Sequence, residues 1–97
     1  MKTPEALVKD RIKSWLRERG AYFFMPVQTG FGASTLDILC CINGRFVGIE
    51  CKRPTEPGMP KGRVTPRQIN TIDAIRAAGG IAFVAEGVAD CVRELGP

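Results

Sequence analysis

The sequence predicts an α/β fold in which a helix is followed by three strands, a second helix, a fourth strand and a closing helix. Three observations predict this order. Asn43-Gly44 between two apolar, β-branched runs is the strongest short signal for a hairpin. Apolar residues recur at helical spacing after Thr3-Pro4, and a capping box over 65–68 opens a second helical segment. With 97 residues, 44% of them hydrophobic, the chain is expected to form one stand-alone domain over 1–97.

The first helix is expected to begin at Pro4, with Thr3 as its N-cap, and to end at Gly20. Its apolar stripe consists of Leu7, Val8, Ile12, Trp15 and Leu16. Glu5 lies on the same stripe. It either points toward the sheet, as a third carboxylate near the hairpin, or serves only to complement the helix dipole in the first turn.

Two segments between the first helix and the hairpin are assigned by composition. Ala21–Val27 is rich in aromatic and β-forming residues and predicts the first strand. Gln28–Thr35 contains two Gly and is predicted to be a loop. The hairpin that follows, Leu36–Lys52, supplies the second and third strands.

The two-residue turn of the hairpin fixes the pairing of its strands. If Ile42 pairs with Arg45, then Asp37 lies directly opposite Glu50. Counting from the turn, this is a non-hydrogen-bonded pair, whose Cα atoms are about 4.5 Å apart. Two carboxylates placed this way repel each other, and a divalent cation between them reverses that effect.

Lys52 joins Asp37 and Glu50 on one face, because strand side chains alternate with period two. One ammonium beside a metal held by two carboxylates makes a site for phosphodiester hydrolysis. The alternatives are a surface hairpin with charged strand ends, and a buried Lys–Glu ion pair with a spare Asp.

Both faces of the hairpin are mostly apolar, so the sheet is expected to be covered by helices on both sides. The face opposite the charged residues carries Leu36, Ile38, Cys40, Ile42, Val47, Ile49 and Cys51.

The segment Arg53–Val64 contains three Pro and two Gly and is predicted to be a loop. Its length and its position directly after Lys52 favour contact with a substrate, and a connector without fixed structure is the alternative.

The second helix begins with Thr65-Pro66 and ends at Gly79-Gly80. Gln68 closes its capping box, and at a helix N-terminus it is also placed to help hold a phosphate or a metal-bound water. Ile81–Ala85 predicts a short buried strand and Val88–Leu95 a closing helix. The stripe of the second helix is expected to be Ile69, Ile72, Ile75 and Ala78.

The net charge of +4 is unevenly distributed and indicates a nucleic-acid partner. Positive charge collects in the first helix and around the loop, beside the proposed acidic site. Ordinary solubilising charge is the alternative. The residues expected to contact DNA are Arg53, Lys61, Arg63, Arg67 and Ser34.

The composition excludes several classes of chemistry. There is no His, which removes the commonest general base and the usual nucleophilic triads. The four cysteines, Cys40, Cys41, Cys51 and Cys91, lack metal-binding spacing and indicate a reducing cytoplasm. No apolar stretch approaches the ~20 residues of a membrane helix, so no membrane partner is expected. Catalysis would have to use carboxylates, Lys and a metal.

These features together resemble the PD-(D/E)XK nucleases: an Asp at the start of one strand, Glu-x-Lys on the next, and the helix–strand order around them. The chain is most similar to the virus-type replication–repair nuclease (VRR-Nuc) domain, and more distantly to archaeal Holliday-junction resolvases. The resemblance is carried by Gly32–Asp37, Gly48–Lys52, Gly62–Gln68 and Ala78–Gly80. The chain differs from the superfamily pattern in having Leu36, rather than Pro, before Asp37.

The resemblance implies a restriction-endonuclease-like core, with a mixed central sheet flanked by helices, and a nuclease that depends on Mg²⁺ or Mn²⁺. By analogy, Asp37, Glu50 and the Cys51 carbonyl hold the metal. Lys52 orients the attacking water or stabilises charge on the scissile phosphate. Glu5, as a further acidic ligand, and Gln68 match accessory positions of the family.

The resemblance also implies a phage or prophage protein, active in the cytoplasm of a bacterial or infected host cell, that cleaves branched DNA as a homodimer. Val88, Val92 and Leu95 are one candidate for the dimer interface. Two alternatives remain: a nucleic-acid-binding module without catalysis, and an interaction subunit of a larger complex.

Overall fold

The computed structural model describes residues 1–27 and 34–97 and confirms the predicted order of elements. They are α1 (Pro4–Glu18), β1 (Tyr22–Phe24), β2 (Ile38–Ile42), β3 (Arg45–Cys51), α2 (Pro66–Ala77), β4 (Ile81–Ala85) and α3 (Val88–Leu95). The first strand is shorter than expected. Most of the loop predicted over 28–35 lies outside the described residues, and the part within them, Ser34 and Thr35, has no regular structure.

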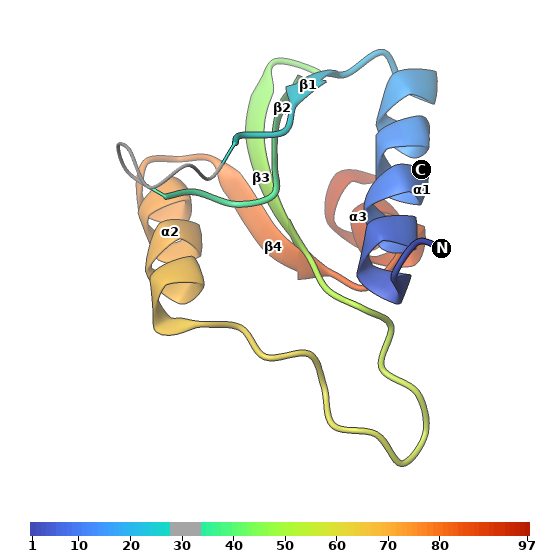
Figure 1. The fold of residues 1–97 in the computed structure, drawn as a ribbon. Helices are drawn as coiled ribbons and strands as arrows, with labels where there is room; N and C mark the ends of the chain where they lie inside the picture. The colour runs from blue at the N-terminus through green and yellow to red at the C-terminus, as the bar shows by residue number, and fades with distance from the viewer. Residues whose placement is uncertain (28–33) are drawn as a thin grey trace.

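The four strands form one mixed sheet in the order β1-β2-β3-β4. The first three are antiparallel neighbours, and β4 runs parallel to β3. Helices α1 and α3 lie on one face of the sheet and α2 on the other (Figure 1). The loop and α2 together form the crossover that a parallel β3–β4 pair requires.

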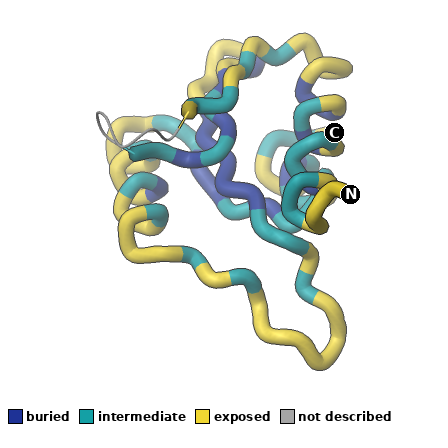
Figure 2. Tube along the Cα trace, viewed as in Figure 1, coloured by how far each residue is buried: buried dark blue, intermediate teal, exposed yellow. Residues whose placement is uncertain are grey.

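The hydrophobic core has two parts, one under each helical layer, as the buried trace in Figure 2 shows. The larger part is built from Val8, Ile12, Trp15 and Leu16 of α1 and the Ile38 face of the sheet, with α3 closing it. The prediction was wrong for Leu7, which is 41% exposed. The smaller part lies beneath α2 and contains Leu36, Ile72 and Ala82. In α2 the prediction was wrong for Ile69, which is 46% exposed, and for Ala78.

The hairpin register is the predicted one, from Ile42↔Arg45 at the turn to Ile38↔Ile49 at the other end. Asn43 and Gly44 have φ of 51° and 74°, as a two-residue turn of this kind requires. Backbone pairing stops one position before Asp37. There the Asp37 side chain accepts a hydrogen bond from the Cys51 N–H at 2.9 Å, in place of the next backbone pair.

The bend at Asp37 corrects two expectations about the faces of the sheet. Leu36 packs beneath α2 and not with Ile38, because strand alternation no longer applies once the strand has ended. The expected coverage of both faces of the sheet by helices is also incomplete. Near the turn, Cys41 and Phe46 are exposed on the α2 face, since α2 does not reach over them.

The segment between β3 and α2 has no regular secondary structure and extends away from the body of the molecule (Figure 1). Two hydrogen bonds fix its course: Thr55 N–H donates to Glu86 Oε1 at 2.6 Å, and Arg53 Nη2 donates to the Pro60 carbonyl at 2.8 Å. The predicted loop is therefore confirmed. None of the described helices is long and apolar enough to span a membrane.

Candidate active site

The centre of the site is Glu50, the next-to-last residue of β3, which is 3% exposed although it is acidic. Asp37 lies beside it, at the point where β2 begins. Burial and the neighbouring charge of Asp37 together outweigh the opposing effect of Lys52 and raise the pKa of Glu50 to about 7. A buried carboxylate beside a second carboxylate favours either a bound proton or a bound cation.

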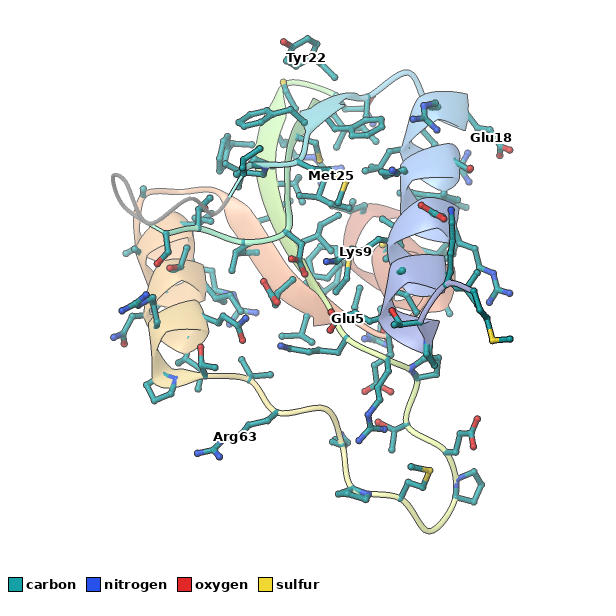
Figure 3. All side chains as sticks on the ribbon, viewed as in Figure 1. Glu5, Lys9, Glu18, Tyr22, Met25 and Arg63 are labelled. Atoms are coloured by element: carbon teal, nitrogen blue, oxygen red, sulfur yellow. The ribbon has the colours of Figure 1, made fainter. Side chains whose placement is uncertain are left out.

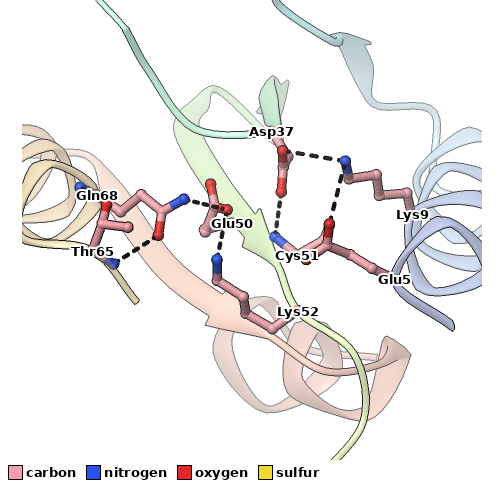
Figure 4. A network of polar contacts seen from close by, with 8 residues as sticks. All are labelled: Glu5, Lys9, Asp37, Glu50, Cys51, Lys52, Thr65 and Gln68. Atoms are coloured by element: carbon pink, nitrogen blue, oxygen red, sulfur yellow. Dashed lines mark hydrogen bonds and ion pairs between the residues drawn. The ribbon is translucent and has the colours of Figure 1, made fainter. Parts of the chain in front are cut away.

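Lys52 points back toward the same carboxylate from the end of β3. Its Nζ lies 3.5 Å from Glu50 Oε2, and its side chain is only 13% exposed (Figure 4). Gly62 of the loop packs against the Lys52 stem, where a Cβ would come within 3.3 Å of Lys52 Cβ. The loop therefore holds the ammonium near Glu50.

Gln68 closes the capping box, as expected, and also contacts Glu50, while its role in holding a phosphate or a metal-bound water stays a prediction. Its Oε1 accepts from the Thr65 N–H at 3.0 Å, and Thr65 Oγ1 accepts from the Gln68 N–H at 3.2 Å, which completes the capping box. Its Nε2 donates to Glu50 Oε2 at 2.9 Å. The cap is worth about 0.5–2 kcal/mol to the helix, and it also fixes the amide that contacts Glu50.

Lys9 belongs to this network, although the sequence pattern did not single it out. Its Nζ lies 3.4 Å from Asp37 Oδ1 and 3.9 Å from Glu5 Oε2. Burial opposes the charged form, but Asp37 and Glu5 outweigh it and raise the pKa of Lys9. The available signal was its i,i+4 spacing from Glu5, next to the buried Val8.

Glu5 joins the site only through Lys9 among the contacts of the described residues. Its side chain is 44% exposed, and Figure 3 shows Glu5 and Lys9 between α1 and the ends of the strands. The expectation that Glu5 faces the sheet thus holds for its position, and its role as a metal ligand stays a prediction.

A hollow of about 240 Å³ opens over the two carboxylates. It is lined by Ser34, Thr35, Asp37, Glu50, Thr65, Arg67, Gln68 and Thr71. A second hollow of about 380 Å³ lies on the other side of Lys52 and includes Glu5, Arg53 and Arg63. A larger, mostly apolar hollow of about 590 Å³ lies along α2 near Phe46 and contains no carboxylate, so it is not the site.

Four of the five expected DNA-contacting residues line these two hollows. Ser34 and Arg67 lie at the first, and Arg53 and Arg63 at the second. Lys61 is exposed on the loop and lines neither. The Arg53 guanidinium also donates a hydrogen bond to the Pro60 carbonyl, so part of its role is to shape the loop.

Cys51 contributes its backbone and not its thiol. The side chain is fully buried in the core, and burial, with Asp37 and Glu50 nearby, raises the pKa of the thiol far above its usual range. Its N–H holds Asp37 in place. The peptide of Cys51 is therefore part of the site.

The donor set fits a hard divalent cation. In the part of the chain that the structure describes, no three His, Cys, Asp or Glu side chains gather in a way that would hold a metal ion. The side-chain ligands on offer are thus two carboxylates, Asp37 and Glu50. Mg²⁺ is commonly bound by one or two carboxylates together with water and substrate phosphates, so two carboxylates suffice.

Comparison with known proteins supports the fold. No family model matches the sequence, and no curated protein matches it. Among solved structures, a chain described as a VRR_NUC domain matches with a TM-score of 0.71 at 18% sequence identity, over 97% of this chain and 98% of the other. The protein therefore has the restriction-endonuclease-like fold of a VRR-Nuc domain, as the sequence predicts.

Proposed function

We propose that this protein is a Mg²⁺- or Mn²⁺-dependent endonuclease of the PD-(D/E)XK type, which hydrolyses phosphodiester bonds in DNA. One observation carries the proposal: two adjacent carboxylates line a hollow, and the Lys52 ammonium lies 3.5 Å from one of them. The fold shared with a VRR_NUC domain supports it independently. A protein that only bound DNA would have no need of a buried carboxylate placed next to a second, partly buried one.

The chain's own groups have separable roles in this proposal. Asp37 and Glu50, with the Cys51 carbonyl, would hold the cation, which supplies Lewis acidity and a water of lowered pKa. Lys52 orients the attacking water or stabilises charge on the scissile phosphate. Gln68 fixes the orientation of Glu50 through its 2.9 Å hydrogen bond.

The two hollows on either side of Lys52 define a path for the DNA backbone. Arg67 and Ser34 would contact phosphates on one side of the scissile bond, and Arg53 and Arg63 on the other. Lys61 would add a contact farther along the loop. We propose branched DNA, such as a four-way junction, as the substrate and a homodimer as the active form, in the cytoplasm of a bacterial or phage-infected host cell.

Cleavage by Asp37→Asn and Glu50→Gln variants tests the assignment. Single-stranded, duplex, flap and four-way DNA are incubated with Mg²⁺ or Mn²⁺, and Asp73→Asn, on the exposed side of α2, serves as the matched control. We expect wild type and the control to cleave, with four-way DNA preferred, and both site variants to be inactive while they still bind DNA. Metal-dependent cleavage by purified Asp37→Asn would contradict the proposal. Binding without cleavage by wild type would favour a non-catalytic module.

A further inference from the structure

The Lys9 ammonium lies between the carboxylates of Glu5 and Asp37. Its Nζ lies 3.4 Å from Asp37 Oδ1 and 3.9 Å from Glu5 Oε2 (Figure 4). Across residues 1–27 and 34–97, it is the only basic side chain that forms an ion pair with either carboxylate. The side chains of Lys9 and Asp37 are partly buried, at 29% and 23% exposed, while that of Glu5 is 44% exposed.

The Asp37 carboxylate is fixed at both oxygens. Oδ1 faces the Lys9 ammonium and Oδ2 accepts the Cys51 N–H at 2.9 Å. Glu50, in contrast, directs Oε2 to Gln68 and Lys52, and it also interacts with the Asp37 side chain. Lys9 therefore neutralises the side of Asp37 that faces Glu5 and leaves the side toward Glu50 for another cation.

The balance of charge favours a single divalent cation. Three carboxylates (Glu5, Asp37 and Glu50) face two ammonium groups in the cluster. One divalent cation leaves a single excess positive charge, which the one negative charge of a phosphodiester balances. A second divalent cation would leave three excess positive charges in a partly buried site, where like charges are poorly screened.

We propose that Lys9 is a positioning residue that takes the place of a second divalent cation, so that the site holds one such cation per chain, between Asp37 and Glu50. The inference rests on the proposed function, because it presupposes a metal at these carboxylates. It also assigns Glu5 the role of partner to Lys9 and not that of a metal ligand.

Counting the Mn²⁺ ions bound to the full chain tests the proposal without reference to activity. Equilibrium dialysis, with free Mn²⁺ followed by electron paramagnetic resonance, gives the number bound per chain. We expect one for wild type and none for Asp37→Asn. Lys9→Met, which keeps the length of the side chain and removes its charge, should bind a second ion. The double variant Lys9→Met/Glu5→Gln should return to one.

Two variants serve as controls. Lys9→Arg keeps the charge and should bind one ion. Lys13→Met removes a charge one turn along α1, where Lys13 pairs with Asp10, and should also bind one. If Lys9→Met is unfolded by circular dichroism, Lys9→Gln replaces it in the same measurement.

Two outcomes would overturn the inference: two Mn²⁺ ions bound per chain by wild type, or a single ion bound by Lys9→Met with Kd unchanged. The absence of any Mn²⁺ on wild type would instead contradict the proposed function, so the two failures are distinguishable.

Discussion

At the scale of single residues, Glu50 links the acidity of the site to the stability of the protein. Its folded-state pKa of about 7 lies above the value of about 4.3 for an unfolded chain. Between these values the folded protein holds a proton that the unfolded protein releases. The stabilisation from this proton is complete below the unfolded pKa and is lost as pH rises through 7.

We therefore predict that, in EDTA, the free energy of unfolding falls between pH 5 and pH 8 by an amount on the order of a few kcal/mol. Glu50→Gln should remove most of this dependence, and added Mn²⁺ should restore stability to wild type at pH 8. Urea denaturation at several pH values measures both effects. Parallel pH profiles for wild type and Glu50→Gln would show that Glu50 is not the responsible group.

Lys52 should matter for turnover far more than for binding. Its ammonium lies at the carboxylate pair, beneath the exposed arginines, and its main interaction is with charge that develops at the phosphate. Lys52→Ala should lower the single-turnover rate at saturating protein by roughly 10²-fold or more. Arg53→Ala, the neighbouring residue, should mainly weaken binding. An unchanged single-turnover rate for Lys52→Ala would make Lys52 only a phosphate contact.

At the scale of elements, the loop between β3 and α2 should supply contacts to the DNA backbone. Lys61 and Arg63 are both exposed on this loop. Figure 3 shows Arg63 on the part of the loop that leads to α2. Lys61→Ala with Arg63→Ala should weaken binding to duplex DNA and flatten its salt dependence, by about 0.9 in log–log slope for each phosphate that is no longer neutralised.

The matched control for the loop variant is Arg17→Ala with Arg19→Ala, which removes the same charge from the opposite end of α1. Fluorescence anisotropy at several salt concentrations gives the slopes. Equal slopes for the loop variant and wild type would mean that the loop does not contact the backbone, and would direct attention to the first helix.

The elements also show why some features were predictable from sequence. The register that places Asp37 next to Glu50 depends on turn chemistry at Asn43-Gly44, and the contacts between Gln68 and Thr65 follow from a capping box. Both signals are local. The ion pair between Lys9 and Asp37 depends on how α1 packs on the sheet, which no local pattern determines. Leu36 was misplaced because the alternation rule was extended past the end of the strand.

At the scale of the whole molecule, a domain this small exposes a large share of its surface, and a two-fold assembly would suit a substrate with two equivalent cleavage points. The interface suggested by the sequence stays a prediction, and its three residues are only partly buried. Val88, Val92 and Leu95 pack against the core of their own chain. The large apolar side chains that stay exposed lie elsewhere, including Tyr22, Phe24 and Phe46.

We predict a homodimer at micromolar concentration, with or without four-way DNA, since the proposed substrate presents two symmetric scissile bonds. Sedimentation equilibrium distinguishes twice the chain mass from the chain mass itself. Simultaneous substitution of Val88 and Val92 should lower stability rather than dissociate the dimer. A monomer under both conditions would remove the assembly, and would weaken the choice of branched DNA with it.

The loop between β3 and α2 begins and ends at one carboxylate. Lys52 at its start and Gln68 at the first turn of α2 both contact Glu50 Oε2. The chain between Lys52 and Gln68 is therefore a loop whose two ends are held together at Glu50. Doubling the length of such a loop costs only about 0.6 kcal/mol in closure entropy. Evolution, or an engineer, can therefore lengthen the outer part of the loop, and change the preferred DNA shape with it, provided that Gly62 still packs against Lys52 and the hydrolytic groups keep their positions.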